Sequence, residues 1–236
     1  MRRRPDRHGR ETIMRTLVSA AALAAVIGLA ASAAIAQAPP AATEAGIQFL
    51  ALDNIPAAGG AKLTVSSPAF KDMADIPFEN TQYRGNVFPG LTWSKGPAAT
   101  KSYAVIMQDT DGVVQGTAIL HWTMYNIPAT VTSLAPGMSA PPAGASYGPN
   151  IRGASQAYMG PRTPAGPKHR YHLQVFALDT TIPANPALTY ADLSAAMKGH
   201  VVASGQTIGL GVVDPNAPPP APRPAGAGAG GPPPAR

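Results

Sequence analysis

The stretch that decides the fold is AVIMQDTDG, residues 104–112, in which an apolar run ends in two carboxylates. Asp109 and Asp111 are unfavourable in a β-strand, and an aspartate is costly to bury without a partner. A strand that runs into Asp-x-Asp departs from its local preference, and such departures concentrate at functional sites. The next strand-like run, HWTMYNIP at 121–128, opens with His121. The two runs together predict a polar site at one end of a β-sheet.

Five short runs rich in β-branched and aromatic residues, separated by loops with Pro and Gly, predict strands. They span residues 61–67, 101–109, 121–127, 169–179 and 200–210. One segment, LTYADLSAAMKGH at 188–200, predicts a helix that Thr189 caps and Gly199 ends. These elements predict a mostly β body, a single domain with a small helical contribution.

Strand periodicity predicts which side chains share a face, because alternate residues of a regular strand point the same way. On the shared face of each strand, the polar residues lie at one end of the strand and the apolar residues lie nearer its middle. Converging strand ends would therefore form a polar pocket above an apolar core. The three predicted groups are Tyr103, Val105, Met107, Asp109 and Asp111, then His121, Thr123 and Tyr125, and then His169, Tyr171 and Leu173.

Both ends of the chain differ from this body. An Arg-rich start runs into the apolar segment 17–36, an arrangement typical of a secretory signal peptide that is cut after Ala36. An uncleaved membrane anchor is the alternative, because the apolar run approaches spanning length.

After this segment, residues 37–45 are predicted to be a short linker and residues 46–213 the folded domain. Residues 214–236, rich in Pro, Ala and Gly, are predicted to be a disordered tail, since they cannot bury enough apolar surface. We expect a secreted, periplasmic protein with no stable membrane anchor after cleavage.

Composition and charge exclude several classes of protein. The 236 residues contain no cysteine, which excludes disulfides, thiolate metal sites, cysteine nucleophiles and a lipid attached to cysteine. The formal net charge is +6, but six of the 18 basic and two of the 12 acidic residues precede position 16. The remainder therefore carries 12 basic and 10 acidic residues, or +2. A weakly positive body without a basic stripe predicts no nucleic-acid partner.

Taken together, the motifs resemble the phosphatidylethanolamine-binding protein (PEBP) family, in its bacterial Raf-kinase-inhibitor-like branch. The segments that carry the resemblance are LTVSSPAFKDMADIPFENTQY, FPGLTWSKGPAATKSYAV, AVIMQDTDG, HWTMYNIPAT, YMGPRTPAGPKHRYHLQVFALD and GHVVASGQTIGL. The similarity covers about residues 60–211, nearly the whole folded body. It implies a β-sandwich with a few short helices and a small anion-binding pocket that requires no metal or other cofactor.

The resemblance also implies site residues. The Asp-Pro-Asp segment of the family falls on Asp109, Thr110 and Asp111, and the histidine that opens the following strand falls on His121. The second block falls on Gly160, Pro161, His169, Arg170 and Tyr171. Thr110 replaces the usual proline, and Arg162 and Thr163 stand where the family has small residues or proline. The candidate ligand-binding residues are therefore Asp109, Asp111, His121, Gly160, Pro161, His169 and Tyr171.

In this interpretation the aspartates do not contact an anion themselves, because like charges repel. They orient and charge the imidazoles, so that His121, His169 and the Tyr171 hydroxyl donate hydrogen bonds to a phosphate-like or carboxylate group. A zinc site is the competing chemistry, because two carboxylates and two imidazoles suit zinc.

Three functions stay open, because one fold can host many functions. The leading hypothesis is a secreted protein that binds a small phosphate-bearing or other anionic ligand and regulates a protein partner, with no catalytic residue. An enzyme that uses the same His/Asp pocket for acid–base chemistry is the first alternative. An inhibitor of a kinase or protease that acts through a surface loop is the second.

Overall fold

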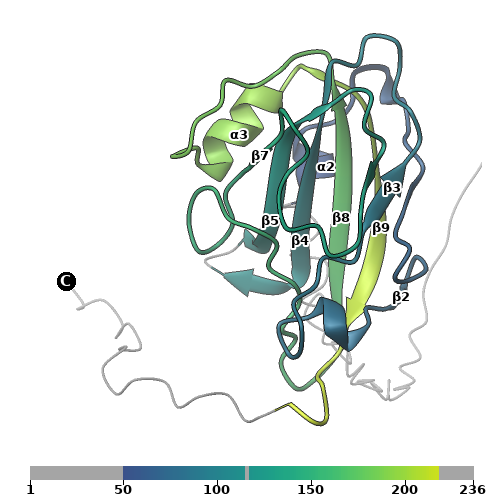
Figure 1. Ribbon diagram of the computed structural model, residues 1–236, viewed down its shortest axis with the longest axis vertical. Helices are drawn as coiled ribbons and strands as arrows, with labels where there is room; N and C mark the ends of the chain where they lie inside the picture. Colours follow the sequence, from purple (N-terminus) through teal and green to yellow (C-terminus); the bar gives the residue numbers. More distant parts are fainter. Residues whose placement is uncertain (1–49, 115–116, 218–236) are drawn as a thin grey trace, which may run out of the picture. The chain divides into compact units, whose positions relative to one another are not determined.

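The computed structural model in Figure 1 describes residues 50–114 and 117–217. The predicted signal peptide (1–36), the linker (37–45) and residues 218–236 of the predicted tail lie outside the described residues. The prediction of a mostly β body with a small helical contribution is confirmed, because strands dominate the described elements.

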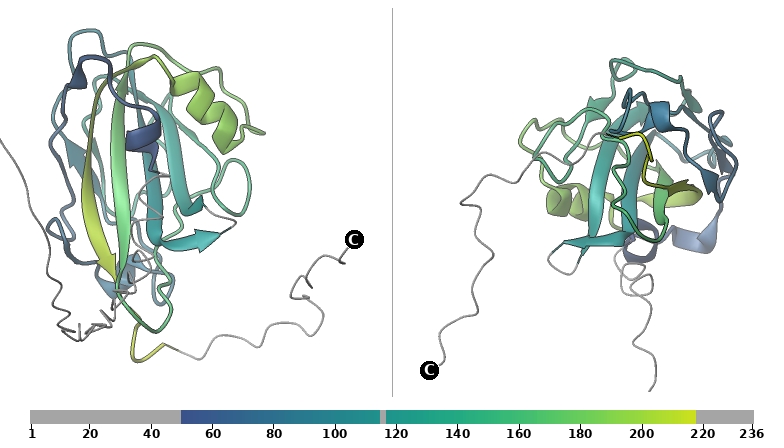
Figure 2. Two further views of the ribbon diagram at one scale, coloured as in Figure 1. Left: turned by 180° about the vertical axis from the view of Figure 1, so that it is seen from behind. Right: turned by 90° about the horizontal axis from the view of Figure 1, so that it is seen from below.

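The described strands form two sheets. The smaller sheet has the order β1-β3-β6, and the larger sheet has the order β2-β9-β8-β4-β5-β7. The four long strands of the larger sheet run side by side in Figure 1 and in the left view of Figure 2. The bounds in the smaller sheet are Val65–Ser66 (β1), Leu91–Trp93 (β3) and Ser133–Leu134 (β6). Those in the larger sheet are Ala74–Asp75 (β2), Val201–Gly211 (β9), His169–Leu178 (β8), Ser102–Val114 (β4), Thr117–Pro128 (β5) and Ser146–Tyr147 (β7).

The described helices are short, and helix α3 has an identifiable local cause. In α3 (Tyr190–Met197) the predicted cap is confirmed, because the Thr189 side chain accepts a hydrogen bond from the backbone of Asp192. The Asp192 carboxylate accepts one from Thr189 in return, which completes a capping box. Helix α2 (Ala51–Asn54) is followed by the 3₁₀ turns η1 (Ala58–Gly60) and η2 (Phe78–Asn80). None of the helices in residues 50–114 and 117–217 has the length and apolar character needed to cross a membrane.

Two apolar cores cover the two faces of the larger sheet. Alternate residues of β4 divide between them, as strand periodicity predicts. Val105 and Met107 pack with Trp93 of the smaller sheet. Ala104 and Ile106 pack with the core residues of α2 and α3 on the opposite face. The larger sheet is therefore buried on both faces. Polar residues at one of its ends are unusual in this setting and are candidates for function.

The folded body continues past the predicted boundary at Val213. Asp214 is buried, and its Oδ2 accepts a hydrogen bond from Arg84 Nε at 2.7 Å. The hydrogen bond from Arg84 is the main cause that holds the pKa of the Asp214 carboxyl below its ordinary value. The sequence pattern missed this contact, because a single acidic residue before a Pro-rich run carries no apolar signal.

Candidate functional site

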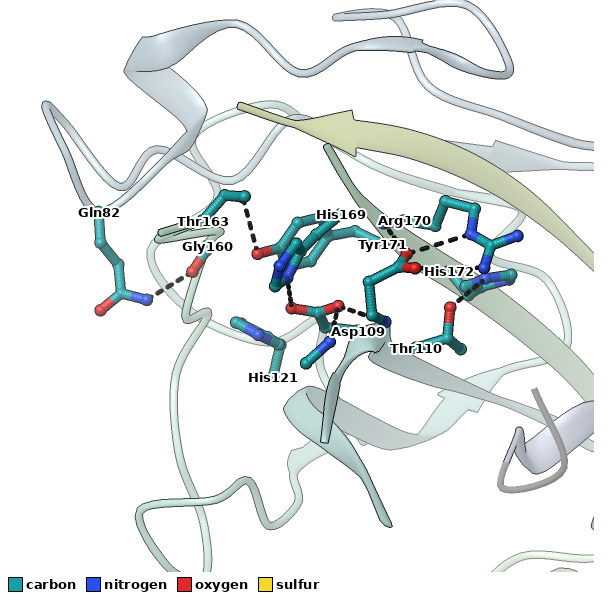
Figure 3. A network of polar contacts seen from close by, with 12 residues as sticks. Gln82, Asp109, Thr110, His121, Gly160, Thr163, His169, Arg170, Tyr171 and His172 are labelled. Carbon is teal, nitrogen blue, oxygen red and sulfur yellow. Dashed lines mark hydrogen bonds and ion pairs between the residues drawn. The ribbon is translucent and has the colours of Figure 1, made fainter. Parts of the chain in front are cut away.

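The candidate site lies around the carboxylate of Asp109, where β4, β5 and β8 are neighbours (Figure 3). Its Oδ2 accepts a hydrogen bond from His169 Nδ1 at 2.8 Å. Its Oδ1 accepts from the backbone N–H groups of Asp111 at 2.9 Å and Gly112 at 2.8 Å. The side chain of Asp109 is only 3% exposed. Three donors thus satisfy a carboxylate that would otherwise be costly to bury in a strand.

Asp111 points away from this cluster. The register between β4 and β5 slips between Asp109 and Val113, and such a slip breaks the alternation of side chains. The Asp111 carboxylate accepts hydrogen bonds from the backbone N–H of Arg170 at 2.7 Å and from its guanidinium at 3.1 and 3.2 Å. His169 and Arg170 are consecutive in β8, so their side chains lie on opposite faces. The expectation that the two aspartates share a face is therefore wrong.

A second irregularity positions His121. In the β4–β5 register Met107 pairs with Trp122 and Gln108 pairs with Leu120, so His121 is an extra, unpaired residue of β5. This bulge lets the His121 ring reach Tyr171, with ring centroids 5.0 Å apart in an edge-to-face arrangement. The predicted grouping of His121 with Thr123 and Tyr125 is wrong, because Tyr125 packs in the core on the other face.

The predicted grouping of His169 with Tyr171 and Leu173 is confirmed. The rings of His169 and Tyr171 are stacked with centroids 6.5 Å apart, and Leu173 lies in the same core as Tyr171. The Tyr171 hydroxyl shares a hydrogen bond of 3.0 Å with Thr163 Oγ1. Burial raises the pKa of Tyr171, and the nearby Asp109 carboxylate raises it further, so the phenol stays neutral. Within the described ranges, no three imidazole and carboxylate groups have the spacing that holds a metal ion.

Both imidazoles are held through Nδ1. His169 Nδ1 faces the Asp109 carboxylate, and His121 Nδ1 lies 3.1 Å from the backbone carbonyl oxygen of Met159. Because a carboxylate and a carbonyl only accept hydrogen bonds, each Nδ1 carries a proton and donates it. Burial lowers the pKa of His121, and the Asp109 carboxylate offsets this only in part. The expectation that His121 is a charged donor is therefore wrong for the free protein, in which it is a neutral imidazole at neutral pH.

Gly160 and Pro161 enter the site through their backbone. The Gly160 N–H donates to Asn86 Oδ1 at 2.7 Å, and the Gly160 carbonyl accepts from Gln82 Nε2 at 2.6 Å. The Pro161 carbonyl accepts from the backbone N–H of Gln82 at 2.8 Å. A Cβ at Gly160 would lie 2.4 Å from the Asn80 carbonyl oxygen, so only glycine fits. Sequence reasoning did not identify Gln82 and Asn86 as site residues, because each is a single polar residue in a loop.

Gly160→Ala should lower the free energy of unfolding by about 1–3 kcal/mol, the usual cost of overpacking. The clash is with a backbone oxygen, which cannot swing aside as a flexible side chain can. Urea denaturation of the variant and the parent protein measures the difference. Ala165→Ser, an exposed change in the same loop, is the control and should stay within about 0.5 kcal/mol. A Gly160→Ala value as small as that of the control would show that the loop shifts freely.

A second polar cluster lies on the Arg170 face of the sheet and was not predicted. His172 is buried, with Nδ1 2.9 Å from Gln206 Oε1 and Nε2 3.2 Å from Thr110 Oγ1. Since the Gln206 oxygen only accepts, His172 Nδ1 donates and Nε2 accepts the Thr110 hydroxyl hydrogen. Thr110 stands where the resemblance implies proline, and its hydroxyl ties β4 to β8 in a way that proline cannot. Figure 3 shows this cluster beside the one around Asp109.

The two buried histidines should make stability depend on pH. Burial lowers the pKa of His121 and of His172, so the unfolded chain binds protons more readily than the folded chain. The free energy of unfolding should therefore decrease as the pH falls below about 6.5, the value for an unperturbed histidine. Urea denaturation between about pH 7.5 and 5.5 avoids the range in which most carboxylates titrate. His121→Gln and His172→Gln should each remove part of the slope, and an unchanged slope in both would contradict this account.

Comparison with known proteins finds a family model, related sequences and a solved structure that are similar to this chain. The family model described as phosphatidylethanolamine-binding protein matches residues 66–212. A UPF0098 protein of Methanothermobacter thermautotrophicus is 34% identical over 151 residues, which are 63% of this chain and 97% of that protein. The Mycobacterium tuberculosis protein named "Putative lipoprotein LppC" is 36% identical over 152 residues, 64% of this chain and 72% of that protein. The crystal structure of E. coli YbcL, titled a new member of the mammalian PEBP family, has a TM-score of 0.60 and 30% identity. The similarity covers 65% of this chain and all of YbcL.

Proposed function

The chain belongs to the phosphatidylethanolamine-binding protein family, and we propose that it binds a small phosphate-bearing or other oxyanionic ligand at His121 and His169. The observation that carries the proposal is the fixed Nδ1–H of both imidazoles. Because Nδ1 of His169 is bonded to Asp109, its Nε2 faces away from that carboxylate and can meet a ligand, and the His121 ring, held by the backbone of Met159 and Gly160, lies next to it across Tyr171. Tyr171 lies against both rings and adds a neutral hydroxyl.

The protonation of His121 constrains the ligand. A neutral imidazole that donates through Nδ1 has a lone pair, and no hydrogen, on Nε2. At His121, whose pKa is lowered by burial, an oxyanion without a proton, such as sulfate, must therefore bind together with a proton that converts the imidazole to imidazolium. An oxyanion with its own O–H, such as dihydrogen phosphate or a singly charged phosphate monoester, can donate to Nε2 directly. We therefore propose that the site prefers oxyanions that carry a proton.

Isothermal titration calorimetry with sulfate and phosphate tests this proposal. At about pH 6, where much of the phosphate is singly charged, phosphate should bind more tightly than sulfate although it carries less charge. Sulfate binding should take up a proton, seen as a dependence of the heat on buffer, and should weaken by up to about tenfold per pH unit above the lowered pKa of His121. His169→Gln should weaken the binding of both sulfate and phosphate. Lys198→Gln, which changes an exposed residue, should alter neither affinity. Sulfate affinity that does not change with pH would overturn the proton requirement.

We also propose that the mature protein is exported. The Arg-rich start and the apolar segment before Gln37 support this, and so does the likeness to a relative whose name calls it a lipoprotein. A lipid attached to cysteine is not available here, because the chain has no cysteine. N-terminal sequencing of protein from a periplasmic extract should read from Gln37. A full-length chain held in the membrane fraction would contradict export with cleavage.

A further inference from the structure

Two arginines in the loops around the site have no acidic partner among residues 50–114 and 117–217. Arg152 contacts a glutamine, and Arg162 lies over an aromatic ring. Both are exposed. Other basic side chains close to site residues in the sequence are neutralised, in the pairs Arg84 with Asp214, Lys168 with Asp75 and Arg170 with Asp111. The loops thus carry two uncompensated positive charges beside a site proposed to take an anion.

Arg152 is fixed to the site at both of its ends. Its backbone N–H donates to Asn150 Oδ1 at 2.7 Å, and Asn150 Nδ2 donates to the backbone carbonyl of His121 at 3.3 Å. Its guanidinium donates through Nη2 to Gln82 Oε1 at 2.8 Å. Gln82 Nε2 in turn donates to the Gly160 carbonyl at 2.6 Å. The guanidinium is therefore one side chain away from the backbone of the site.

Arg162 is connected to the site through Tyr83, the residue that follows Gln82. Its guanidinium carbon lies 5.3 Å from the ring centroid of Tyr83. The Tyr83 hydroxyl donates to the Thr163 carbonyl, and Thr163 Oγ1 shares a hydrogen bond with the Tyr171 hydroxyl. Because Gln82 and Tyr83 are consecutive, one short segment supports both guanidinium groups beside the loop that carries Gly160.

We propose that the natural ligand carries two anionic groups, one held at the imidazoles and a second held by Arg152 and Arg162, as a small bisphosphate would. This inference rests on the proposed anion site. A guanidinium has several N–H donors in a planar fork, and Arg152 uses only one nitrogen on Gln82. Arg162 lies over the ring of Tyr83, and a stacked guanidinium keeps its N–H edges free. A second phosphate would neutralise two positive charges that have no acidic partner among residues 50–114 and 117–217.

Two probes that differ by one phosphate test this inference. Propyl phosphate carries one anionic group, and propanediol bisphosphate carries two on the same carbon chain. By calorimetry at fixed pH, the protein should bind the bisphosphate about tenfold more tightly than the monophosphate. The double change Arg152→Gln with Arg162→Gln should abolish that difference and leave monophosphate affinity within about twofold. Lys198→Gln removes one exposed positive charge elsewhere and should preserve the difference.

The outcomes separate this inference from the anion site itself. If both probes bind equally to the parent protein, or if the double variant loses affinity for both alike, the arginines only attract anions in general and the two-group ligand is overturned. If neither probe binds, the anion site fails and this inference fails with it. Each arginine changed alone should lose part of the preference, which keeps the test valid if the double variant does not fold. Thermal unfolding of each variant checks that the fold is retained.

Discussion

Asp109→Ala is expected to lower the free energy of unfolding by about 3–5 kcal/mol, because each buried donor left without its acceptor costs about 1–3 kcal/mol. The change leaves His169 Nδ1 and the backbone N–H groups of Asp111 and Gly112 without their acceptor. Asp111→Ala is the matched control, two residues away in the same strand. It should cost less, about 1–3 kcal/mol, because Arg170 is 25% exposed and water can replace its partner. Urea denaturation at neutral pH measures both values.

The order of these two values is the decisive result. Equal losses of unfolding free energy would mean that the two carboxylates stabilise the fold to the same extent. The burial of Asp109 on one face of the sheet would then not set it apart from Asp111 on the other. Asp109→Asn adds a test of the hydrogen-bond assignment, because an amide can keep one oxygen for the backbone N–H groups. Its NH₂ group would then face His169 Nδ1, which must become an acceptor. Nitrogen NMR of the imidazole should therefore show the proton moving from Nδ1 to Nε2 in this variant.

Trp122→Ala should also cost about 3–5 kcal/mol, because truncation of a fully buried tryptophan removes apolar contacts and leaves a cavity. The indole packs on Phe88, with ring centroids 5.0 Å apart, and on Tyr158, at 6.0 Å. Because Trp122 follows His121 in the chain, the loss of this packing should also loosen the imidazole and weaken phosphate binding.

Trp122→Phe is the conservative comparison for this prediction. It keeps an aromatic ring and removes an indole N–H that has no hydrogen-bond partner among the described residues. The variant should therefore lose much less stability than Trp122→Ala and should retain phosphate affinity. Equal losses in stability would mean that the cavity does not determine the cost. Unchanged phosphate affinity in Trp122→Ala would show that His121 is positioned without this packing.

The local sequence pattern was sufficient to predict most of the long strands and the helix α3. The long strands β4, β5, β8 and β9 fall on four of the five predicted runs, because β-branched and aromatic residues alternate there over many positions. Helix α3 carries its own start and stop signals in Thr189 and Gly199. The predicted strand at 61–67 was mostly wrong, since only β1 at Val65–Ser66 forms there. Short pairings of this kind depend on a partner strand far away in the chain.

The composition of the site was also readable from the chain, because Asp109, His121, His169 and Tyr171 stand at the ends of strand-like runs. Their arrangement was not, because it depends on two departures from regular pairing. The slip after Asp109 sends Asp111 to the other face, and the bulge at His121 turns its ring toward Tyr171. A one-residue slip reverses the face of every side chain beyond it, and nothing in the alternation of residues marks where such a slip occurs.

The protonation of the site and its supports came from contacts between residues far apart in the sequence. The residue types at His121 and Asp109 suggested a charged donor, but burial favours the neutral imidazole, and burial is a property of the packed molecule. Gln82, which connects Arg152 to the loop of Gly160, lies about 80 residues from that glycine. A sequence specifies which groups are available and which local shapes they prefer. Desolvation and long-range hydrogen bonds act only once the chain has brought those groups together, and they determine here that Nδ1 of each imidazole is the nitrogen held by Asp109 or Met159.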